Sequence, residues 1–341
     1  MSNGEILQKM IGAFVKGDDK AFREAALDSI NEEKRKNHHV LARELEKTLA
    51  RANGSAGFTS RSLDILPRSG GSLPQDKNRV VDLVEVREAD QEIEELVLSS
   101  TTHESLLRII EENRKGELLR THGMRPVNKL LFYGPPGCGK TTAAEAIAKK
   151  LYFPLVLVRF DAVISSYLGD TAANLRQVFE FARRQPMVLF FDEFDAVGKR
   201  RDDADEHGEL KRVVNSFLQM LDSWSGESVV IAATNHEGML DPALWRRFDE
   251  IVGFLRPDAI LMEEVLLRKL RGQKLAPEVD LRAAAIRLSE TQDSSHADAE
   301  RVAYDAIKSA ILKRESPLKQ ETFVDALERT VIRLAAVHNM S

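Results

Sequence analysis

The sequence contains one cysteine, Cys138, so it cannot form an intramolecular disulfide, and a reducing compartment is indicated. It also lacks the run of about 20 apolar residues that a membrane helix needs. The first residues carry no basic stretch followed by an apolar core, so we expect no signal peptide, no membrane partner and a cytoplasmic location. Basic residues are not in excess, because the sequence contains 49 Lys and Arg and 54 Asp and Glu. Nucleic acid is therefore not the expected partner, although a local basic stripe is compatible with this balance.

The N-terminal part of the chain divides by composition. Residues 2–52 carry three apolar stripes at helical spacing, which predict a small helical bundle over 1–53 that docks a partner or client. Gly, Ser and Pro fill 11 of the next 25 positions, so we predict a flexible linker over 54–79. The few apolar residues of this segment leave open that it docks on a partner instead.

From about residue 80, short apolar strands alternate with amphipathic helices. The apolar runs predict strands at 129–133, 154–159, 187–192, 228–233 and 250–254, and helices at 140–151, 171–183 and 208–222. This alternation predicts an α/β fold, with a large domain over 80–256 built on a parallel five-stranded sheet flanked by helices. After residue 256 the pattern is purely helical, and Ser295 with Asp298 forms a capping-box start, so we predict a helical lid domain over 257–341.

A glycine-rich segment between a predicted strand and a predicted helix matches the phosphate-binding pattern G-x-x-x-x-G-K-[ST]. In such a loop the backbone N–H groups surround the phosphates of ATP, the lysine neutralises them, and the threonine hydroxyl faces Mg²⁺. The alternative is a glycine-rich turn with an accidental lysine. The predicted nucleotide-binding residues are Gly134, Pro135, Pro136, Gly137, Cys138, Gly139, Lys140, Thr141 and Thr142. Cys138 occupies a free position of the pattern, and we interpret it as a packing residue without redox chemistry.

A second chemical signal is the pair of carboxylates that ends the apolar run at 188–191. Asp192 is predicted to hold Mg²⁺ together with Thr141, and Glu193 to polarise the attacking water. Taken alone, Asp-Glu after a strand is often the start of a loop. About 50 residues beyond a phosphate loop, a catalytic role is the favoured interpretation.

Three further segments follow in order: FDEFDA at 191–196, AATN at 232–235 and LDPALWRRFD at 240–249. Together with the phosphate loop, they resemble the AAA clade of AAA+ ATPases over about residues 95–315. Members of this clade include AAA proteases, proteasomal ATPases and microtubule-severing enzymes. The resemblance implies an ATPase that forms a ring, usually a homo-hexamer, with ATP bound between neighbouring subunits.

The resemblance also assigns roles to three polar residues. Asn235 matches the sensor 1 position, whose amide contacts the γ-phosphate or the attacking water. Arg247 matches an arginine finger that reaches the site of the next subunit. The family has two such arginines separated by Pro-Gly, whereas here Arg246 directly precedes Arg247, so Arg246 is the weaker candidate. Two ordinary surface arginines are the alternative.

Other segments bear on what the ATP energy is used for. Tyr167, Leu168 and Gly169 resemble the pore loop with which AAA+ rings grip an extended polypeptide, although a buried loop tyrosine is the alternative. Residues 199–209 match either a second pore loop or an ordinary solvated loop. His296 stands where the family commonly has glycine, which leaves the nucleotide contacts of the lid open.

These features favour a ring that unfolds or remodels protein clients. No protease motif is present, so proteolysis would need a separate chain. The domain plan is similar to stand-alone bacterial AAA ATPases that accompany a subtilisin-like protease in phage-defence or plasmid-linked pairs. The alternatives are a nucleotide-switched sensor or assembly ring that threads nothing, and a nucleic-acid motor, which the acidic balance of charge disfavours.

Overall fold

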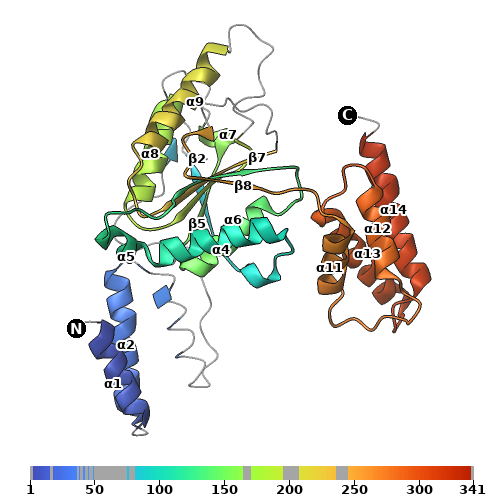
Figure 1. Ribbon diagram of the computed structural model, residues 1–341, viewed down its shortest axis with the longest axis horizontal. Coiled ribbons are helices and arrows are strands. Elements are labelled where there is room, and N and C mark those ends of the chain that lie inside the picture. The colour runs from blue at the N-terminus through green and yellow to red at the C-terminus, as the bar shows by residue number, and fades with distance from the viewer. Residues whose placement is uncertain are drawn as a thin grey trace.

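The computed structural model describes residues 3–15, 18–36, 38, 41–42, 45, 49, 75–76, 81–163, 170–194, 207–235 and 245–338. Its centre is a twisted six-stranded sheet with helices on both faces (Figure 1). The sheet contains β3 (Val84–Arg87), β4 (Lys129–Tyr133), β5 (Leu155–Val158), β6 (Val188–Phe191), β7 (Val229–Thr234) and β8 (Glu250–Gly253).

The strand order is β3-β5-β6-β7-β4-β8, and the five predicted strands pair in parallel. The prediction of five strands was one too low, because β3 adds an edge strand that pairs antiparallel with β5. Only Val84 of β3 is fully buried, and charged residues alternate with its two valines. A four-residue strand with this composition lacks the continuous apolar run by which the other strands were recognised.

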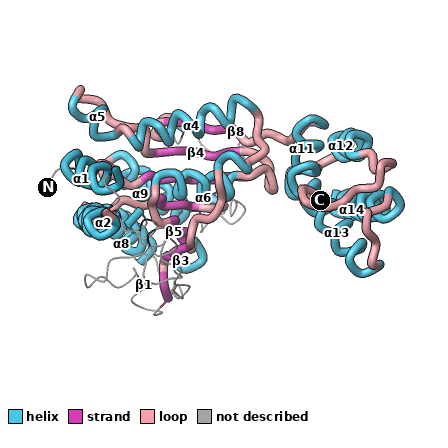
Figure 2. The backbone as a smooth tube through the Cα atoms, turned by 90° about the horizontal axis from the view of Figure 1, so that it is seen from below, coloured by secondary structure: helices cyan, strands magenta, loops and turns pink. Residues whose placement is uncertain are grey.

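Helices cover the sheet because successive strand residues alternate between its faces. Phe190 packs with α4 (Ser100–Arg114) and α6 (Lys140–Leu151), whereas Phe191 packs with α8 (Asp170–Arg183) and α9 (His207–Asp222). Figure 2 shows α4 and α6 along one face of the strands. The rings of Phe191 and Phe217 lie 5.0 Å apart at a steep angle, a favourable aromatic geometry. The remaining short elements of this domain are η2 (Ile93–Glu95), α5 (Gly116–Thr121) and α7 (Phe160–Val163).

Four helices after the sheet form a separate small core, as predicted for the lid. They are α11 (Ala259–Lys269), α12 (Leu281–Glu290), α13 (His296–Lys313) and α14 (Gln320–His338). Val97 packs against this core, and Arg268 donates to the carbonyl oxygen of Glu94, so η2 and the residues after it contact the lid. Figure 1 shows the lid beside the strand ends rather than over a sheet face.

The N-terminal segment begins with a helical hairpin of α1 (Asn3–Val15) and α2 (Asp19–Arg35), which matches two of the three predicted helices. Asp18 accepts the N–H of Ala21 at 3.0 Å and so caps α2. Of the third predicted helix the structure describes residues 41–42, 45 and 49, which are helical, and most of the predicted linker lies outside the described residues. At the end of the predicted linker, β1 (Gln75–Asp76) pairs with β2 (Val81–Asp82), which lies at the start of the predicted large domain. None of the described helices combines the length and apolar character needed to cross a membrane.

Candidate nucleotide site

The carboxyl ends of neighbouring parallel strands meet at one edge of the sheet. Tyr133, at the end of β4, pairs with Thr234 at the end of β7, and the N–H of Gly134 donates to the carbonyl oxygen of Thr234 at 3.3 Å. Asp192 and Asn235 follow the ends of β6 and β7 directly. The fold therefore gathers the predicted phosphate loop, metal ligand and sensor at the edge where parallel sheets bind ligands.

The phosphate loop has a backbone that requires glycine. Gly134 has φ +137°, and a Cβ there would lie 2.1 Å from the backbone oxygen of Phe254. The side chain of Lys140, the first residue of α6, is drawn back over the loop, where Nζ donates to the carbonyl oxygens of Gly134 at 2.6 Å and Pro135 at 2.8 Å. The loop thus combines a helix N-terminus with a buried ammonium group, an arrangement that attracts phosphate.

The two predicted metal-binding residues lie in contact. Thr141 Oγ1 donates to Asp192 Oδ2 at 3.1 Å, although 51 residues separate them in the chain. A hydroxyl and a carboxylate oxygen are the hard ligands that Mg²⁺ prefers, so these residues fit the ion. The next residue, Glu193, is exposed and has φ +50°, and its N–H donates to Asp192 Oδ1 at 2.9 Å. Left-handed backbone at a residue other than glycine is uncommon and recurs at functional sites.

The lid touches the phosphate loop through the start of α13. The N–H of Ala297 donates to the carbonyl oxygen of Gly137 at 3.2 Å, and a Cβ on Gly137 would lie 2.5 Å from Ser295 Oγ. Ser295 donates through its N–H and its hydroxyl to Asp298 Oδ2, and Arg333 donates to Asp298 Oδ1 at 2.7 Å. The predicted capping box is confirmed, and it fixes the lid residues that meet the loop.

Two ionisable side chains at this junction are uncharged at neutral pH. Burial raises the pKa of the Cys138 thiol, which agrees with a packing role. Burial lowers the pKa of His296 from 6.5 to about 4. Both ring nitrogens of His296 are closed to solvent and have no hydrogen-bond partner among the described residues.

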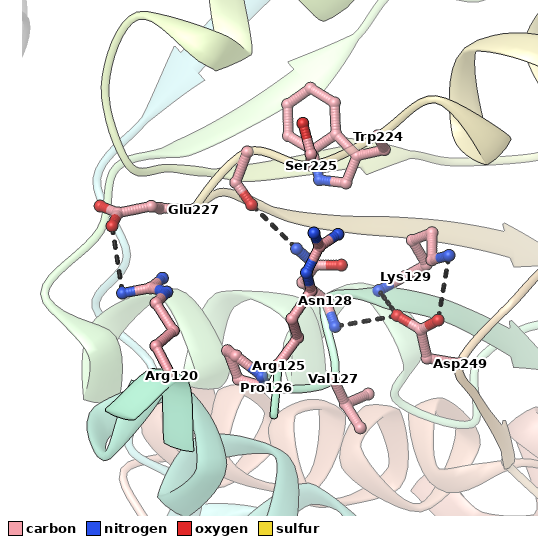
Figure 3. A pocket seen from close by; sticks show the side chains of 11 residues that line it. Arg120, Arg125, Pro126, Val127, Asn128, Lys129, Trp224, Ser225, Glu227 and Asp249 are labelled. Carbon is pink, nitrogen blue, oxygen red and sulfur yellow. Dashed lines mark hydrogen bonds and ion pairs between the residues drawn. The ribbon is translucent and has the colours of Figure 1, made fainter. Parts of the chain in front are cut away.

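The chain that follows the two predicted arginines reaches the opposite edge of the sheet. Asp249, two residues after Arg247, accepts the N–H groups of Asn128 and Lys129 at 3.2 and 3.0 Å, at the start of β4 (Figure 3). From Lys129 to Gly134 the strand rises about 3.3 Å per residue, so this edge is roughly 17 Å from the phosphate loop. Arg247 forms an ion pair with Asp222, at the end of α9. In the structure this ion pair engages the Arg247 guanidinium, which makes no contact with the described residues of its own phosphate loop.

Arg246 and Arg247 differ in their surroundings. Arg246 is exposed and has no partner among the described residues, whereas Arg247 is half-buried in its ion pair with Asp222. The sequence pattern favours Arg247 as the finger, but it contains no information on this ion pair.

A cavity of about 500 Å³ opens at the same edge of the sheet (Figure 3). Its wall includes an ion pair between Arg120 and Glu227 at 3.2 Å and another between Lys129 and Asp249 at 3.0 Å. Because it lies at the amino ends of the strands, it is not the nucleotide site.

Comparison with known proteins decides the family. The profile of the ATPase family associated with various cellular activities (AAA) matches residues 130–256. The chain is 41% identical over 335 residues to "Uncharacterized AAA family ATPase y4kL" of Sinorhizobium fredii, an alignment that covers 98% of this chain and 97% of that protein. The chain belongs to the AAA ATPase family. It is an ATP-hydrolysing enzyme, and the resemblance inferred from the motifs is confirmed.

Other relatives of this AAA ATPase align with about two thirds of it. ATP-dependent zinc metalloprotease FtsH 3 of Sphaerobacter thermophilus is 35% identical over 233 residues, which cover 67% of this chain and 47% of that protein. Proteasome-activating nucleotidase of Pyrococcus horikoshii is 36% identical over 222 residues, which cover 63% of this chain and 55% of that protein. The chain thus aligns with only about half of each of these two relatives.

The motifs of the AAA ATPase did not reveal Arg87. This β3 residue donates to Glu85 at 2.8 Å, and that bond is the main reason why its pKa is raised. Burial opposes the rise, while the carboxylates of Glu145 and Asp192 add to it. Arg87 therefore contributes positive charge near the predicted metal ligand. No motif surrounds Arg87 in the sequence, because only strand pairing brings it close.

The predicted pore loop of the AAA ATPase, Tyr167, Leu168 and Gly169, lies outside the described residues. Most of the predicted second pore loop lies outside them too, and only its last residues are described, at the start of α9. Both loops remain predictions.

The buried state of His296 leads to a prediction on stability. The unfolded chain binds the proton near pH 6.5 and the folded chain only near pH 4, so stability is complete above pH 6.5 and falls as the pH drops between these values. At pH 5 the loss is expected to be about 2 kcal/mol. Urea unfolding midpoints at pH 7.5 and pH 5.0 measure this loss of stability. His296→Leu is the control, because it has no imidazole to protonate at this position. Equal losses in the two proteins would contradict the prediction.

Proposed function

We propose that this ATPase assembles into a closed ring of identical subunits, six in the usual family arrangement, and that the ring unfolds or remodels protein clients. The observation that carries the ring is the separation of its functional groups. Thr141 and Asp192 contact each other at the nucleotide site, whereas Arg247 pairs with Asp222. Because Arg247 pairs with Asp222 rather than with a group of its own nucleotide site, we expect it to act on the ATP bound by a neighbouring subunit.

The reaction follows from these residues. The phosphate loop and Lys140 bind the triphosphate of ATP, and Thr141 and Asp192 are the residues that would hold Mg²⁺. When bound, the ion would neutralise charge on the phosphates. Glu193 accepts a proton from the attacking water, Asn235 orients that water, and a neighbour's arginine stabilises the charge of the transition state.

The relatives support a protein client. One is named as an ATP-dependent metalloprotease and another as a proteasome-activating nucleotidase. Since this sequence has no protease motif, the proposed ring passes its client to a separate protease or releases it remodelled. A defence role with a subtilisin-like partner, a cytoplasmic location and the docking role of residues 1–53 are parts of the same proposal.

Tyr167→Ala tests the threading step. A permanently unfolded polypeptide should raise the ATPase rate of the wild-type ring several-fold, and the variant should keep its basal rate but lose this stimulation, because an aromatic side chain grips the chain by apolar contact. The measurement is steady-state phosphate release with and without the polypeptide.

Other outcomes of that measurement would favour the alternatives. Full stimulation of the Tyr167→Ala ring, or none in the wild type, would favour a nucleotide-switched ring without threading. Stimulation by DNA or RNA with steep salt dependence would favour a nucleic-acid motor. Sedimentation of the wild type with and without ATP tests the ring itself, and a monomer under both conditions would contradict it.

A further inference from the structure

A contact between two aromatic rings connects the predicted arginines with the end of a central strand. Trp245 directly precedes Arg246 and Arg247, and Tyr133 is the last residue of β4, directly before the phosphate loop. The two ring centroids lie 5.3 Å apart at an interplanar angle of 63°. This edge-to-face arrangement is a favourable geometry for an aromatic pair. The arginine segment, residues 245–249, is therefore attached to β4 at its first residue.

The neighbouring strand β8 supports the ring of Tyr133. Tyr133 lies opposite Gly253 in the parallel register of β4 and β8. A Cβ on Gly253 would lie 2.7 Å from the hydroxyl oxygen of Tyr133, so glycine leaves the space that this side chain fills. Trp245 is half-buried and packs against the core on one face of the sheet. The aromatic pair thus rests on the sheet itself.

Asp249 fixes the other end of the arginine segment. Its carboxylate accepts the N–H groups of Asn128 and Lys129, and it pairs with the ammonium group of Lys129 at 3.0 Å (Figure 3). Between the two ends, Phe248 is buried in the same core as Trp245. The two arginines therefore lie on a short segment that is held at both ends.

We propose that Trp245 is a positioning residue for the arginine that acts on the ATP of a neighbouring subunit. This inference rests on the proposed action of Arg247. An arginine finger works only where its guanidinium meets the charge of the transition state, and a misplacement of about 1 Å can cost about 100-fold in rate. Since the Arg247 side chain is long, its reach depends on the backbone from which it starts. Asp249 fixes that backbone on one side, and Trp245 fixes it on the other through Tyr133.

Trp245→Leu removes the aromatic contact and keeps an apolar side chain. We expect turnover to fall about 10–100-fold and ADP affinity to stay within about twofold, because the phosphate loop of the same subunit is unchanged. Trp245→Phe, which can still form an aromatic pair, should retain most of the turnover. Phe323→Leu is the matched control, since it removes a fully buried ring from the lid core and should change turnover less than about twofold. Steady-state phosphate release and calorimetric ADP binding measure these effects.

Mixed rings distinguish positioning from a general structural defect. Trp245→Leu subunits keep an intact phosphate loop, and Lys140→Ala subunits keep a correctly placed arginine. Mixing the two proteins should therefore restore part of the turnover, whereas a general defect of the Trp245→Leu subunit would persist in its own site. An absence of rescue in rings shown to mix, or wild-type turnover of Trp245→Leu alone, would overturn the inference.

Tyr133→Leu tests the same contact from the other strand, so the test does not depend on the folding of Trp245→Leu. It should show the same loss and the same rescue, and the double variant should be slower than either single variant by no more than about twofold, because both changes remove one contact. Losses that multiply in the double variant would contradict the inference. Failure of the proposed function is distinguishable, since Arg247→Ala would then keep wild-type turnover. If Arg247→Ala is inactive but both leucine variants are fully active, only the inference on Trp245 fails.

Discussion

Arg247→Ala is expected to lower ATP turnover by about 10³–10⁵-fold, while the affinity for nucleotide changes little. The reason is that an arginine finger stabilises charge that develops only in the transition state. Because Arg247 pairs with Asp222 rather than with a group of its own nucleotide site, its target is expected to be the ATP of a neighbour. Turnover and ADP binding of the purified variant measure the two effects separately.

Mixed rings decide whether the arginine acts between subunits. Arg247→Ala and Lys140→Ala are each expected to be inactive alone, but mixing them should restore part of the activity, since some interfaces then combine an intact loop with an intact arginine. An absence of rescue in rings shown to mix would contradict an intersubunit site. Arg246→Ala is the comparison, because Arg246 is exposed and without a partner among the described residues.

Asp222→Ala tests whether Arg247 acts in catalysis or only forms a structural ion pair. The partly exposed ion pair is expected to contribute only about 0–1 kcal/mol to stability. If Arg247 serves only to hold Asp222, both variants should behave alike. If Arg247 is the finger, Asp222→Ala should retain most of the turnover, because the guanidinium is still present.

Glu193→Gln is expected to lower hydrolysis by about 10²–10⁴-fold while ATP still binds. Glutamine keeps the size of the side chain but cannot accept the proton of the attacking water. Single-turnover hydrolysis and equilibrium ATP binding measure the two quantities. The variant should also hold the ring in its ATP-bound state, so it is the form with which to capture the client and any separate protease.

Asp192→Asn is the matched control for this experiment. Asp192 contacts Thr141, so its change should weaken the dependence of ATP binding on Mg²⁺ rather than hydrolysis alone. If Glu193→Gln loses ATP binding to the same extent as Asp192→Asn, the assignment of Glu193 as the base is wrong. If it hydrolyses ATP at the wild-type rate, another group activates the water.

Much of the sheet domain was predictable from the sequence because local patterns determine it. A largely apolar run such as 129–133, alternating with amphipathic helices, indicates a strand of a parallel sheet covered on both faces, and glycine at 134 is required where the backbone has positive φ. Edge strand β3 was not predicted because its charged residues, which face solvent, interrupt the apolar run that marks a buried strand. Arg87 was missed for a different reason: two of the carboxylates that raise its pKa, those of Glu145 and Asp192, come from segments far away in the sequence.

By itself, the sequence determined the fold class, the phosphate loop and the order of the motifs, because each depends on residues that are close along the chain. Only the tertiary structure decided that Thr141 meets Asp192, that Arg247 pairs with Asp222, and that the nitrogens of His296 are buried without partners among the described residues. These are contacts between distant segments, and they depend on strand order and on how the lid packs. Residue spacing along the chain reveals neither the strand order nor the packing of the lid.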